Sequence, residues 1–584
     1  MTQRKRGFFL MDKIKNGGNF MKKTKQAVAL LLCIGMSFPV FAACRSGVNA
    51  KKDPKTINVQ ALKAGHGVDW LYEVAGKVEA AYASEGYKVN IMEPSSDMRG
   101  SVVLQEMARG YEEMGVDLYI AGNTLPDQLG ADGEYGVLAE NVQDIFWNQP
   151  AIGYDGKEES TTIKSKVDGY IYNAFVDSHG ITYSMPYIQS VGGLVVNTKK
   201  LATYNLEIPK TTNQLFDCFE KIYLGHNGVP NSKESHVYPF TYPPGTENGY
   251  VLSFLSMNMA QYDIDEYNNF MSFTDAEGPM REDGYEVFNT PGLYEMLRVA
   301  HRLMDYEISS PGTTTQTLDG AQAQIMRDGG AVFMPNGDWF FNEVKLNFKN
   351  NLNDVTFINY PVSSALGVRL FGSGTSYNQS DAVCEEWLSY IINCADEGKT
   401  ADEIVALMSS AKSATVAKAD VQEVCNARAM RTMASTANTN MMITKGSDKK
   451  DIAALFCRMI ASEDAAATIF ATANSNSAYS SAQRENTQYS FLNGAAKIIN
   501  RADAIIVDKD ASGFRKTMGV TTITPLKGHL QGALSVYSVG YYKSGAITPG
   551  VSLSSYDNDA KKMQEAEYEN AKANWAKWLA NAGL

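Results

Sequence analysis

The stretch Thr56-Ile57-Asn58-Val59-Gln60-Ala61-Leu62 sets the fold class of this chain. Its apolar and polar side chains alternate, which is typical of a β-strand with one buried face. The period then changes, because the next apolar side chains recur at helical spacing, at Leu71, Val74, Ala75, Val78, Ala81 and Tyr82. The pattern predicts a strand followed by an amphipathic helix.

The same alternation of strand and helix continues downstream. Residues 87–92 and 116–120 have strand patterns, and a helical pattern from about Ser101 to Met114 lies between them. Strands that alternate with helices of these lengths predict a parallel α/β sheet, which binds ligands in the crevice beyond the strands' carboxyl ends. A site on this part of the chain should therefore use residues near His66 to Trp70 and near Asn123.

Four later blocks occur in the order found in a known family. Gly180–Tyr187 with Gly193–Leu201 resembles the mid-chain signature of the family 1 extracellular solute-binding proteins. Residues 208–215, 321–339 and 441–456 resemble that family's Pro-x-Thr helix start, its helix–strand–turn block and its strand–helix return. Gln214 stands where the family has Glu and keeps a capping-box side chain. The resemblance spans about residues 56–480.

The resemblance implies an α/β fold of the periplasmic-binding-protein-like type II, in which hinge strands join two α/β lobes and the ligand cleft lies between them. We expect the first lobe to contain residues 56–190 and about 365–500. The second lobe should contain residues 191–364 and about 501–584. Helical patterns at about 381–437 do not fit the family, and we interpret them as an insertion in the first lobe.

The resemblance also implies two or three crossings between the lobes. We expect them near Ser190 to Gly193, within 359–374 and within 441–444, and closure about such hinges is a known motion of two-lobed binders. Near the C-terminus, one helix face is apolar and should pack against a lobe, with an external partner as the alternative; it comprises Tyr568, Ala571, Trp575, Trp578 and Leu579.

The first 43 residues have the features of an export signal. Lys22-Lys23-Thr24-Lys25 precedes the apolar segment 27–43, which contains glycine and proline and is short of the roughly 20 apolar residues of a membrane span. We therefore expect residues 1–43 to be a signal peptide rather than a permanent helix. Met21 is an alternative start, because the basic residues before it are foreign to a signal peptide.

The segment Phe41-Ala42-Ala43-Cys44 resembles a bacterial lipobox, with Phe41 in place of the usual Leu. The resemblance implies that Cys44 is acylated, becomes the mature N-terminus and anchors the chain to the membrane. Residues 44–55 would then form a tether. The alternative is an ordinary cysteine just after an Ala-Ala cleavage site.

The charge of the chain argues against several partners. Residues 1–43 hold eight basic residues and one acidic residue, so the remainder carries 45 Lys and Arg against 64 Asp and Glu, a formal charge of −19. Such an acidic surface repels phosphate backbones and anionic headgroups, so nucleic acid is not an expected partner and membrane contact should come from the lipid alone.

Cysteine and histidine spacing gives no sign of a metal or cofactor. No Cys-x-x-Cys occurs, and the six histidines are scattered. Five cysteines remain after Cys33 and Cys44, and their apolar surroundings favour buried thiols over a disulfide framework; they are Cys218, Cys384, Cys394, Cys425 and Cys457.

The common catalytic motifs are absent from the sequence. It contains no Gly-x-Ser-x-Gly, no His-Glu-x-x-His and no complete phosphate-binding loop. Gly398-Lys399-Thr400 resembles only the end of such a loop, and we interpret it as a helix end and turn. The pairs Glu112-Glu113 and Glu385-Glu386 are adjacent on helices, so their side chains diverge. We expect no enzyme, and a surface glycosidase is the best enzymatic alternative.

A sugar site needs a flat apolar ring and short polar side chains for the hydroxyl groups. The aromatic candidates are Trp339, which follows a predicted strand and a Gly-Asp turn, Tyr187 and Trp70. Core packing, hinge packing and the apolar helix face are their respective alternatives. The remaining candidates are Asp338, Asp69, Asn123, His66 and Tyr242. Asp69 could equally be an acid at a helix N-terminus, and Tyr242 a residue of a plain surface loop.

The resemblance implies a function in import. The chain would be a monomeric, lipid-anchored binding protein at the extracellular face of the cytoplasmic membrane. It would capture a carbohydrate, an oligosaccharide in particular, and deliver it to the permease of an ABC transporter. A polyamine, a peptide or an iron complex is the alternative ligand, and a purely structural lipoprotein is a third possibility.

Overall fold

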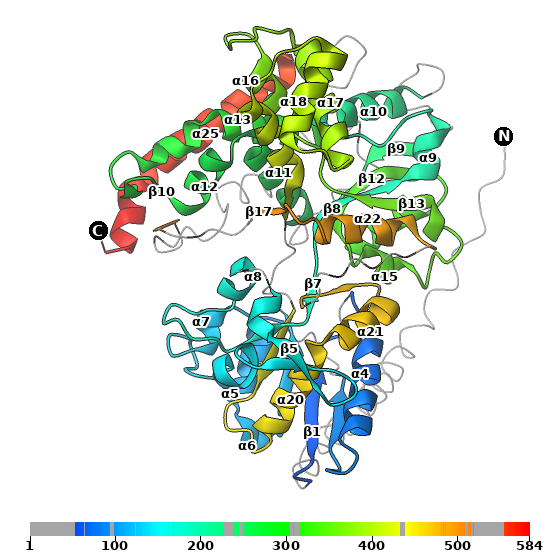
Figure 1. The fold of residues 1–584 in the computed structure, drawn as a ribbon. Coiled ribbons are helices and arrows are strands. Elements are labelled where there is room, and N and C mark those ends of the chain that lie inside the picture. Colours follow the sequence, from blue (N-terminus) through cyan, green and yellow to red (C-terminus); the bar gives the residue numbers. More distant parts are fainter. Residues whose placement is uncertain are drawn as a thin grey trace, which may run out of the picture.

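A computed structural model describes most of the chain from Asp53 to Gly583. Outside the described residues lie 1–52, 64, 94–98, 123, 168, 226–236, 244–248, 304–307, 309–315, 433–438, 480, 481, 483, 485, 487, 508–511, 513, 516, 517, 519–553 and 584, together with the side chains of 554–559. The predicted signal peptide, Cys44 and Asn123 therefore lie outside them. Figure 1 shows two bodies, one above the other, joined by a few chain segments.

The lower body, the first lobe, is built on a five-stranded sheet in the order β2-β1-β3-β15-β6. Its strands are β1 (Thr56–Ala61), β2 (Lys88–Met92), β3 (Leu118–Ala121), β15 (Asn440–Ile443) and β6 (Met185–Pro186). Its helices are α4 (Asp69–Ala81), α5 (Ser101–Ala108), α6 (Tyr111–Met114), α7 (Pro126–Leu129), α8 (Gly169–Asn173), α20 (Lys450–Ile460) and α21 (Glu463–Ala473), and β4 (Pro150–Ile152) pairs with β5 (Glu158–Thr162). The predicted first strand and helix are confirmed.

The upper body, the second lobe, has a four-stranded sheet in the order β13-β8-β12-β9. The strands are β8 (Gly192–Asn197), β9 (Val237–Phe240), β12 (Gly330–Gly337) and β13 (Val355–Ile358). Every residue of β8 and β12 is buried, since helices cover both faces of the sheet. The helices are α9 (Thr198–Thr203), α10 (Thr212–Leu224), α11 (Gly249–Tyr262), α12 (Ile264–Ser272), α13 (Pro291–Leu303), α14 (Leu318–Met326), α15 (Phe340–Val344), α22 (Ser490–Ile499) and α25 (Ser554–Asn581), with the short pair β10 (Thr274–Asp275) and β11 (Gly278–Pro279).

The C-terminal helix α25 packs against the second lobe, as its apolar face predicts. Ala571 and Trp575 belong to that lobe's core. The Trp575 indole also donates a hydrogen bond to the Arg281 carbonyl at 2.8 Å.

The chain passes between the lobes three times. The first crossing, predicted at residues 190–193, leads from β7 (Ile188–Gln189) into β8, and this prediction is confirmed. The second runs from β14 (Met430–Thr432), which pairs with β17 (Ile505–Val507), to β15. The third leads from β16 (Asn476–Ser477), the partner of β7, to α22.

The crossing predicted within residues 359–374 is wrong. This segment stays in the second lobe, where the Val362 carbonyl accepts a hydrogen bond from the Thr212 amide at 2.9 Å, and it then starts α16 (Ser364–Phe371). The third crossing, near residue 480, was not expected from the sequence.

The helical insertion belongs to the second lobe, which corrects its predicted place in the first. Together with α16, helices α17 (Asp381–Asp396), α18 (Ala401–Lys412) and α19 (Lys418–Ala429) form a separate hydrophobic core. Gln214 of α10 donates to the Ser389 hydroxyl at 2.9 Å, and Gln261 of α11 donates to the Ala427 carbonyl at 3.3 Å. Helix α22 also packs on β13 of the second lobe, so residues 490–499 were likewise misplaced.

All five predicted thiols are buried and unpaired in the described part of the chain.

Candidate ligand-binding site

The carboxyl edges of both sheets lie at the crossings. In the first lobe β15 is antiparallel to β3 and β6, so its first residue, Asn440, pairs with the last residues of those strands, Ala121 and Pro186. In the second lobe β12 is antiparallel to β8, so Gly337 at the end of β12 pairs with Gly192, where the chain arrives from the first lobe. Ligands of α/β sheets bind at such carboxyl edges.

Trp339 lies between the lobes at this edge. A Cβ atom on Gly337 would lie 2.2 Å from the Trp339 ring, and a Cβ atom on Gly65 of the first lobe would lie 3.1 Å from the Trp339 Cβ. The absence of side chains at both glycines therefore makes room for this tryptophan. The residue is partly exposed, and its ring centroid lies 5.9 Å from that of Tyr250 and 6.3 Å from that of His66.

His66 connects three segments at the crossings. Its Nδ1 lies 2.7 Å from the Ser475 hydroxyl, and its Nε2 lies 3.2 Å from the hydroxyl of Ser190 in the first crossing. Burial lowers the pKa of His66 to about 4, so the imidazole is neutral at pH 7. Both ring nitrogens already have hydrogen-bond partners at the crossings. This arrangement favours a role for His66 in stabilising the hinge over a role in contacting a ligand.

Asp338 is also tied to the first crossing. Its amide donates to the Val191 carbonyl at 3.1 Å, and its Oδ1 accepts from the Val191 amide at 3.3 Å. The side chain is buried, and burial raises the pKa of this carboxyl to about 7. Asp338 was predicted to contact sugar hydroxyl groups. In the structure it instead attaches the end of β12, just before Trp339, to Val191 of the first crossing.

Asp338 should make stability depend on pH. Because its pKa is higher in the folded chain than the usual 3.8, its contribution is fully present below about pH 4 and is lost as the pH rises towards 7. An asparagine side chain cannot ionise, so we expect the melting temperature of Asp338→Asn minus that of the wild type to increase from pH 5 to pH 8. A change of about 1 kcal/mol corresponds to about 2–4 °C. Differential scanning calorimetry measures it.

The control for this prediction is Asp69→Asn, the same change at an exposed carboxyl in the first turn of α4. Its difference from the wild type should stay flat over the same range. A flat difference for Asp338→Asn as well would show that the Asp338 carboxyl does not titrate in this range.

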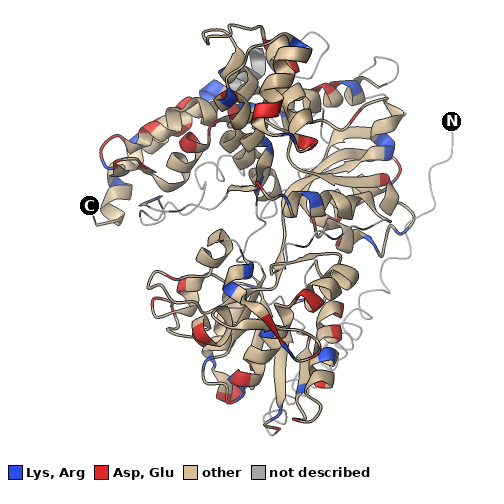
Figure 2. Ribbon diagram, viewed as in Figure 1, with Lys and Arg blue, Asp and Glu red and all other residues tan. Residues whose placement is uncertain are grey.

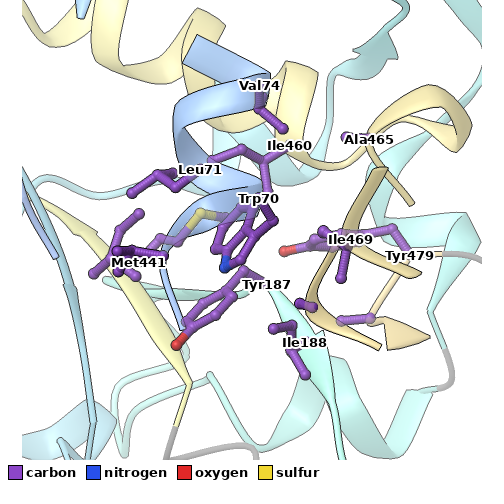
Figure 3. Close-up of a cluster of buried hydrophobic side chains, with 14 of the residues drawn as sticks. Trp70, Leu71, Val74, Tyr187, Ile188, Met441, Ile460, Ala465, Ile469 and Tyr479 are labelled. Atoms are coloured by element: carbon purple, nitrogen blue, oxygen red, sulfur yellow. The ribbon is translucent and has the colours of Figure 1, made fainter. Parts of the chain in front are cut away.

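Trp70 and Tyr187 are packed inside the first lobe. Their rings stack with centroids 5.3 Å apart and planes inclined by 17°, and Figure 3 shows them among Met441, Ile460 and Tyr479. Trp70 is 1% exposed and Tyr187 is 3% exposed. Neither ring offers a face to a ligand in this arrangement, which favours the packing alternative for both.

The remaining candidates lie apart from one another. Tyr242 is buried in the core of the second lobe, 5.8 Å from Phe240, and so neither covers a cleft nor lies in a surface loop. Asp69 is exposed in the first turn of α4, where the helix dipole favours an acid.

Other residues at the same edge were missed in the sequence. Tyr250, at the start of α11, faces Trp339. Tyr72 is 48% exposed and donates to Glu93 at 3.1 Å, and Glu93 in turn pairs with Lys63 at 3.4 Å, just beyond β2 and β1. The helical pattern could have shown that Tyr72 points away from the core, because Leu71 and Val74 point into it.

Two asparagines at the strand ends keep unused hydrogen-bonding capacity. Asn336 Nδ2 and Asn440 Oδ1 have no partner among the described residues, although both side chains are fully buried. Asn336 Oδ1 accepts from the Gly337 amide, and Asn440 Nδ2 donates to the Thr124 carbonyl at 2.8 Å. Both atoms thus lack a partner among the described residues, although neither is open to a ligand in this arrangement.

Charge is mixed over the surface. Figure 2 shows acidic and basic residues intermingled on both lobes. Within the described ranges, no three His, Cys, Asp or Glu side chains gather as metal ligands would, and no helix there combines the length and apolar character of a membrane span.

No protein-family model and no curated protein matches the chain in sequence. Solved structures do match its fold. The apo form of RafE from Streptococcus pneumoniae has a TM-score of 0.51 at 12% identity and covers 88% of this chain and 98% of its own. The chain has the fold of the two-lobed solute-binding proteins. The predicted fold class is thereby confirmed.

Two further structures share this solute-binding fold. Maltose-bound T. maritima MalE3 has a TM-score of 0.50 at 12% identity, covering 87% of this chain and 99% of its own. A probable secreted solute-binding lipoprotein from Streptomyces coelicolor has a TM-score of 0.50 at 13% identity, with coverages of 89% and 99%. Identities this low establish the fold and leave the ligand to be argued from the site.

Proposed function

We propose that this chain is the extracellular binding component of an ABC importer, and that it captures a carbohydrate between its lobes and delivers it to the permease. The observation that carries the proposal is Trp339, a partly exposed residue whose ring lies over Gly337 where the carboxyl edges of both sheets meet the crossings. MalE3, which has the same fold, is named as a maltose-bound protein.

The chemistry of this edge suits a sugar. The rings of Trp339 and Tyr250 provide apolar surface for the C–H face of a pyranose. An oligosaccharide would use both rings, so we propose it as the ligand in preference to a single sugar.

The alternative ligands find less support at this edge. A polyamine would need several carboxylates, but Asp338 is buried against Val191, Glu93 pairs with Lys63, and Glu343 accepts from Gln322. The acidic pairs considered for a glycosidase lie elsewhere, because Glu112 and Glu113 precede β3 at the opposite end of the sheet and Glu385 belongs to the insertion.

Binding should stabilise the full-length protein. A ligand at 100 times its dissociation constant stabilises the folded state by about 2.7 kcal/mol. We therefore expect at least one maltodextrin or other oligosaccharide in a thermal-shift screen to raise the melting temperature, and calorimetric titration should confirm saturable binding.

A polyamine and a short peptide serve as controls in the same screen. The hinge adds a second readout, because a saccharide held between the lobes should also reduce the radius of gyration in small-angle scattering. Stabilisation by spermidine or peptide alone would overturn the carbohydrate assignment. A particle that does not contract when saturated would contradict closure.

We further propose that residues 1–43 are a signal peptide and that acylated Cys44 holds the protein on the outer face of the cytoplasmic membrane. Cys44→Ser removes the thiol that would carry the lipid, so we expect the variant in the soluble fraction or the medium. Cell fractionation measures this, and Ser46→Ala should stay with the membrane. An unacylated wild-type N-terminus in mass spectrometry would contradict the anchor.

A further inference from the structure

A large cavity lies between the insertion and the second lobe, and neither Trp339 nor Tyr250 lines it. It has a volume of about 920 Å³, which is within the usual range for small-molecule sites. Its walls come from the end of β13, the turn between α17 and α18, helix α19, strand β14 and the turn after α22. The cavity thus exists only because the insertion packs on this lobe.

The lining of this cavity is strongly basic in an otherwise acidic chain. Among the described residues two carboxylates line it, Asp396 and Asp503, against five cationic side chains: Lys399, Arg428, Arg431, Lys497 and Arg501. Burial acts to raise the pKa of Asp396, but the hydrogen bonds and charges of Arg428 and Lys210 together lower it, and a hydrogen bond from Arg501 lowers the pKa of Asp503. Both carboxylates are therefore ionised at pH 7, and the lining carries a formal excess of three positive charges.

Two arginines are held in fixed positions by these carboxylates. Arg428 donates two hydrogen bonds to the Asp396 carboxylate, from Nε at 2.7 Å and from Nη2 at 3.0 Å. Arg501 donates in the same way to Asp503, from Nε at 2.6 Å and from Nη2 at 3.1 Å. Arg501 Nη1 also donates to the Arg428 carbonyl at 3.3 Å, which ties the two together. A guanidinium has five N–H groups, so each arginine keeps N–H donors beyond the bonds to its own carboxylate.

An asparagine, Asn500, also lines the cavity. Asn500 Nδ2 is buried and makes no hydrogen bond to any described residue. Lys497 lies one helical turn before it and is exposed, and Lys399 reaches the cavity from the opposite wall, in the turn that begins at Gly398. Positioned guanidinium groups and two lysines form the donor set that recognises carboxylate and phosphate groups.

We propose that this cavity, the insertion cavity, binds a small anion with more than one phosphate or carboxylate group. The site is separate from the carbohydrate site, since neither Trp339 nor Tyr250 lines it. The Gly398-Lys399-Thr400 turn, which does not form a nucleotide-binding loop, contributes one of its cations.

The test uses the full-length protein with inorganic pyrophosphate and with citrate, at constant ionic strength maintained with sodium chloride. Calorimetric titration should show saturable binding of at least one of them. Lys399→Glu/Lys497→Glu should weaken it by at least about tenfold, because hydrogen bonds to charged groups are lost and repulsion replaces attraction. Both lysines lie at the surface, so the variant should keep the wild-type circular dichroism spectrum.

The matched control is Lys157→Glu/Lys418→Glu, which makes the same charge change at two exposed lysines that do not line the cavity. It should bind the anion like the wild type, and Trp339→Ala should also retain anion binding while losing the saccharide. No saturable binding of either probe, or equal weakening in the two double variants, would overturn the proposal.

Discussion

Trp339→Ala should lose about 30- to 1000-fold in saccharide affinity. A stacking ring in a binding site buries apolar contact on the order of 2–4 kcal/mol, and alanine provides none of it. The residue is partly exposed and its ring lies over Gly337 at the edge where the lobes join, so the loss should fall on binding. Isothermal titration with the best saccharide from the screen measures the effect.

The melting temperature of the same variant separates the two roles of Trp339. Trp339→Phe keeps a ring and should retain most of the affinity. The matched control is Trp387→Ala, which removes a tryptophan from the core of the insertion and should reduce stability without changing saccharide affinity. If Trp339→Ala binds normally but melts early, the ring belongs to the core and the proposed sugar-binding wall is wrong.

Trp70→Ala should have the opposite signature, a large loss of stability. The indole is 1% exposed, stacks on Tyr187 at 5.3 Å and donates to the Gly67 carbonyl at 3.2 Å. Truncation of a buried tryptophan costs about 3–5 kcal/mol, because the surrounding side chains fill the cavity only in part. Denaturant unfolding followed by circular dichroism measures the free energy of unfolding.

A neighbour on the same helix provides the control for Trp70. Tyr72 is 48% exposed, so Tyr72→Ala should change stability by less than about 0.5 kcal/mol. If Trp70→Ala unfolds like the wild type yet binds saccharide poorly, Trp70 contacts the ligand, and the packing interpretation fails.

The first strand and helix could be predicted because their patterns are local. The periods of β1 and α4 are complete within 26 residues, from Thr56 to Ala81. The roles of Trp70 and Tyr187 could not be predicted, since each ring is buried by the other and they are far apart in the sequence. A helical or strand period shows which side is apolar but not which distant residue covers it.

Trp339 was predicted from a short-range signal, a strand that ends in a Gly-Asp turn. The neighbouring Tyr250 was missed because it lies at the start of α11, whose residues 251–261 are all buried. A helix without a polar face gives no sequence signal that its first turn lies beside Trp339. Asp338 shows the limit of residue type alone. A carboxylate near a ring suggested hydroxyl binding, whereas its position beside Val191 ties it to the hinge.

The insertion was recognised in sequence but assigned to the wrong lobe. Its helical patterns indicate only that it has an apolar face to bury. The lobe to which an insertion belongs depends on where its two ends join the rest of the chain. Here the segments before and after the insertion lie together, because the Asn359 side chain donates a hydrogen bond to the Met430 carbonyl at 2.7 Å. Because this contact joins β13 to β14, the whole insertion stays with the second lobe.

The place of β15 in the first sheet has a consequence for the order of folding. β15 lies between β3 and β6, and its Asn440 bonds to Thr124 across 316 residues of chain. The first three strands, although made first, therefore cannot complete their sheet until nearly the whole second lobe has been synthesised. The insertion, by contrast, is a continuous segment whose contacts are largely local. Because long-range pairing is slow, we expect the insertion to become protected from hydrogen exchange before the N-terminal strands during refolding.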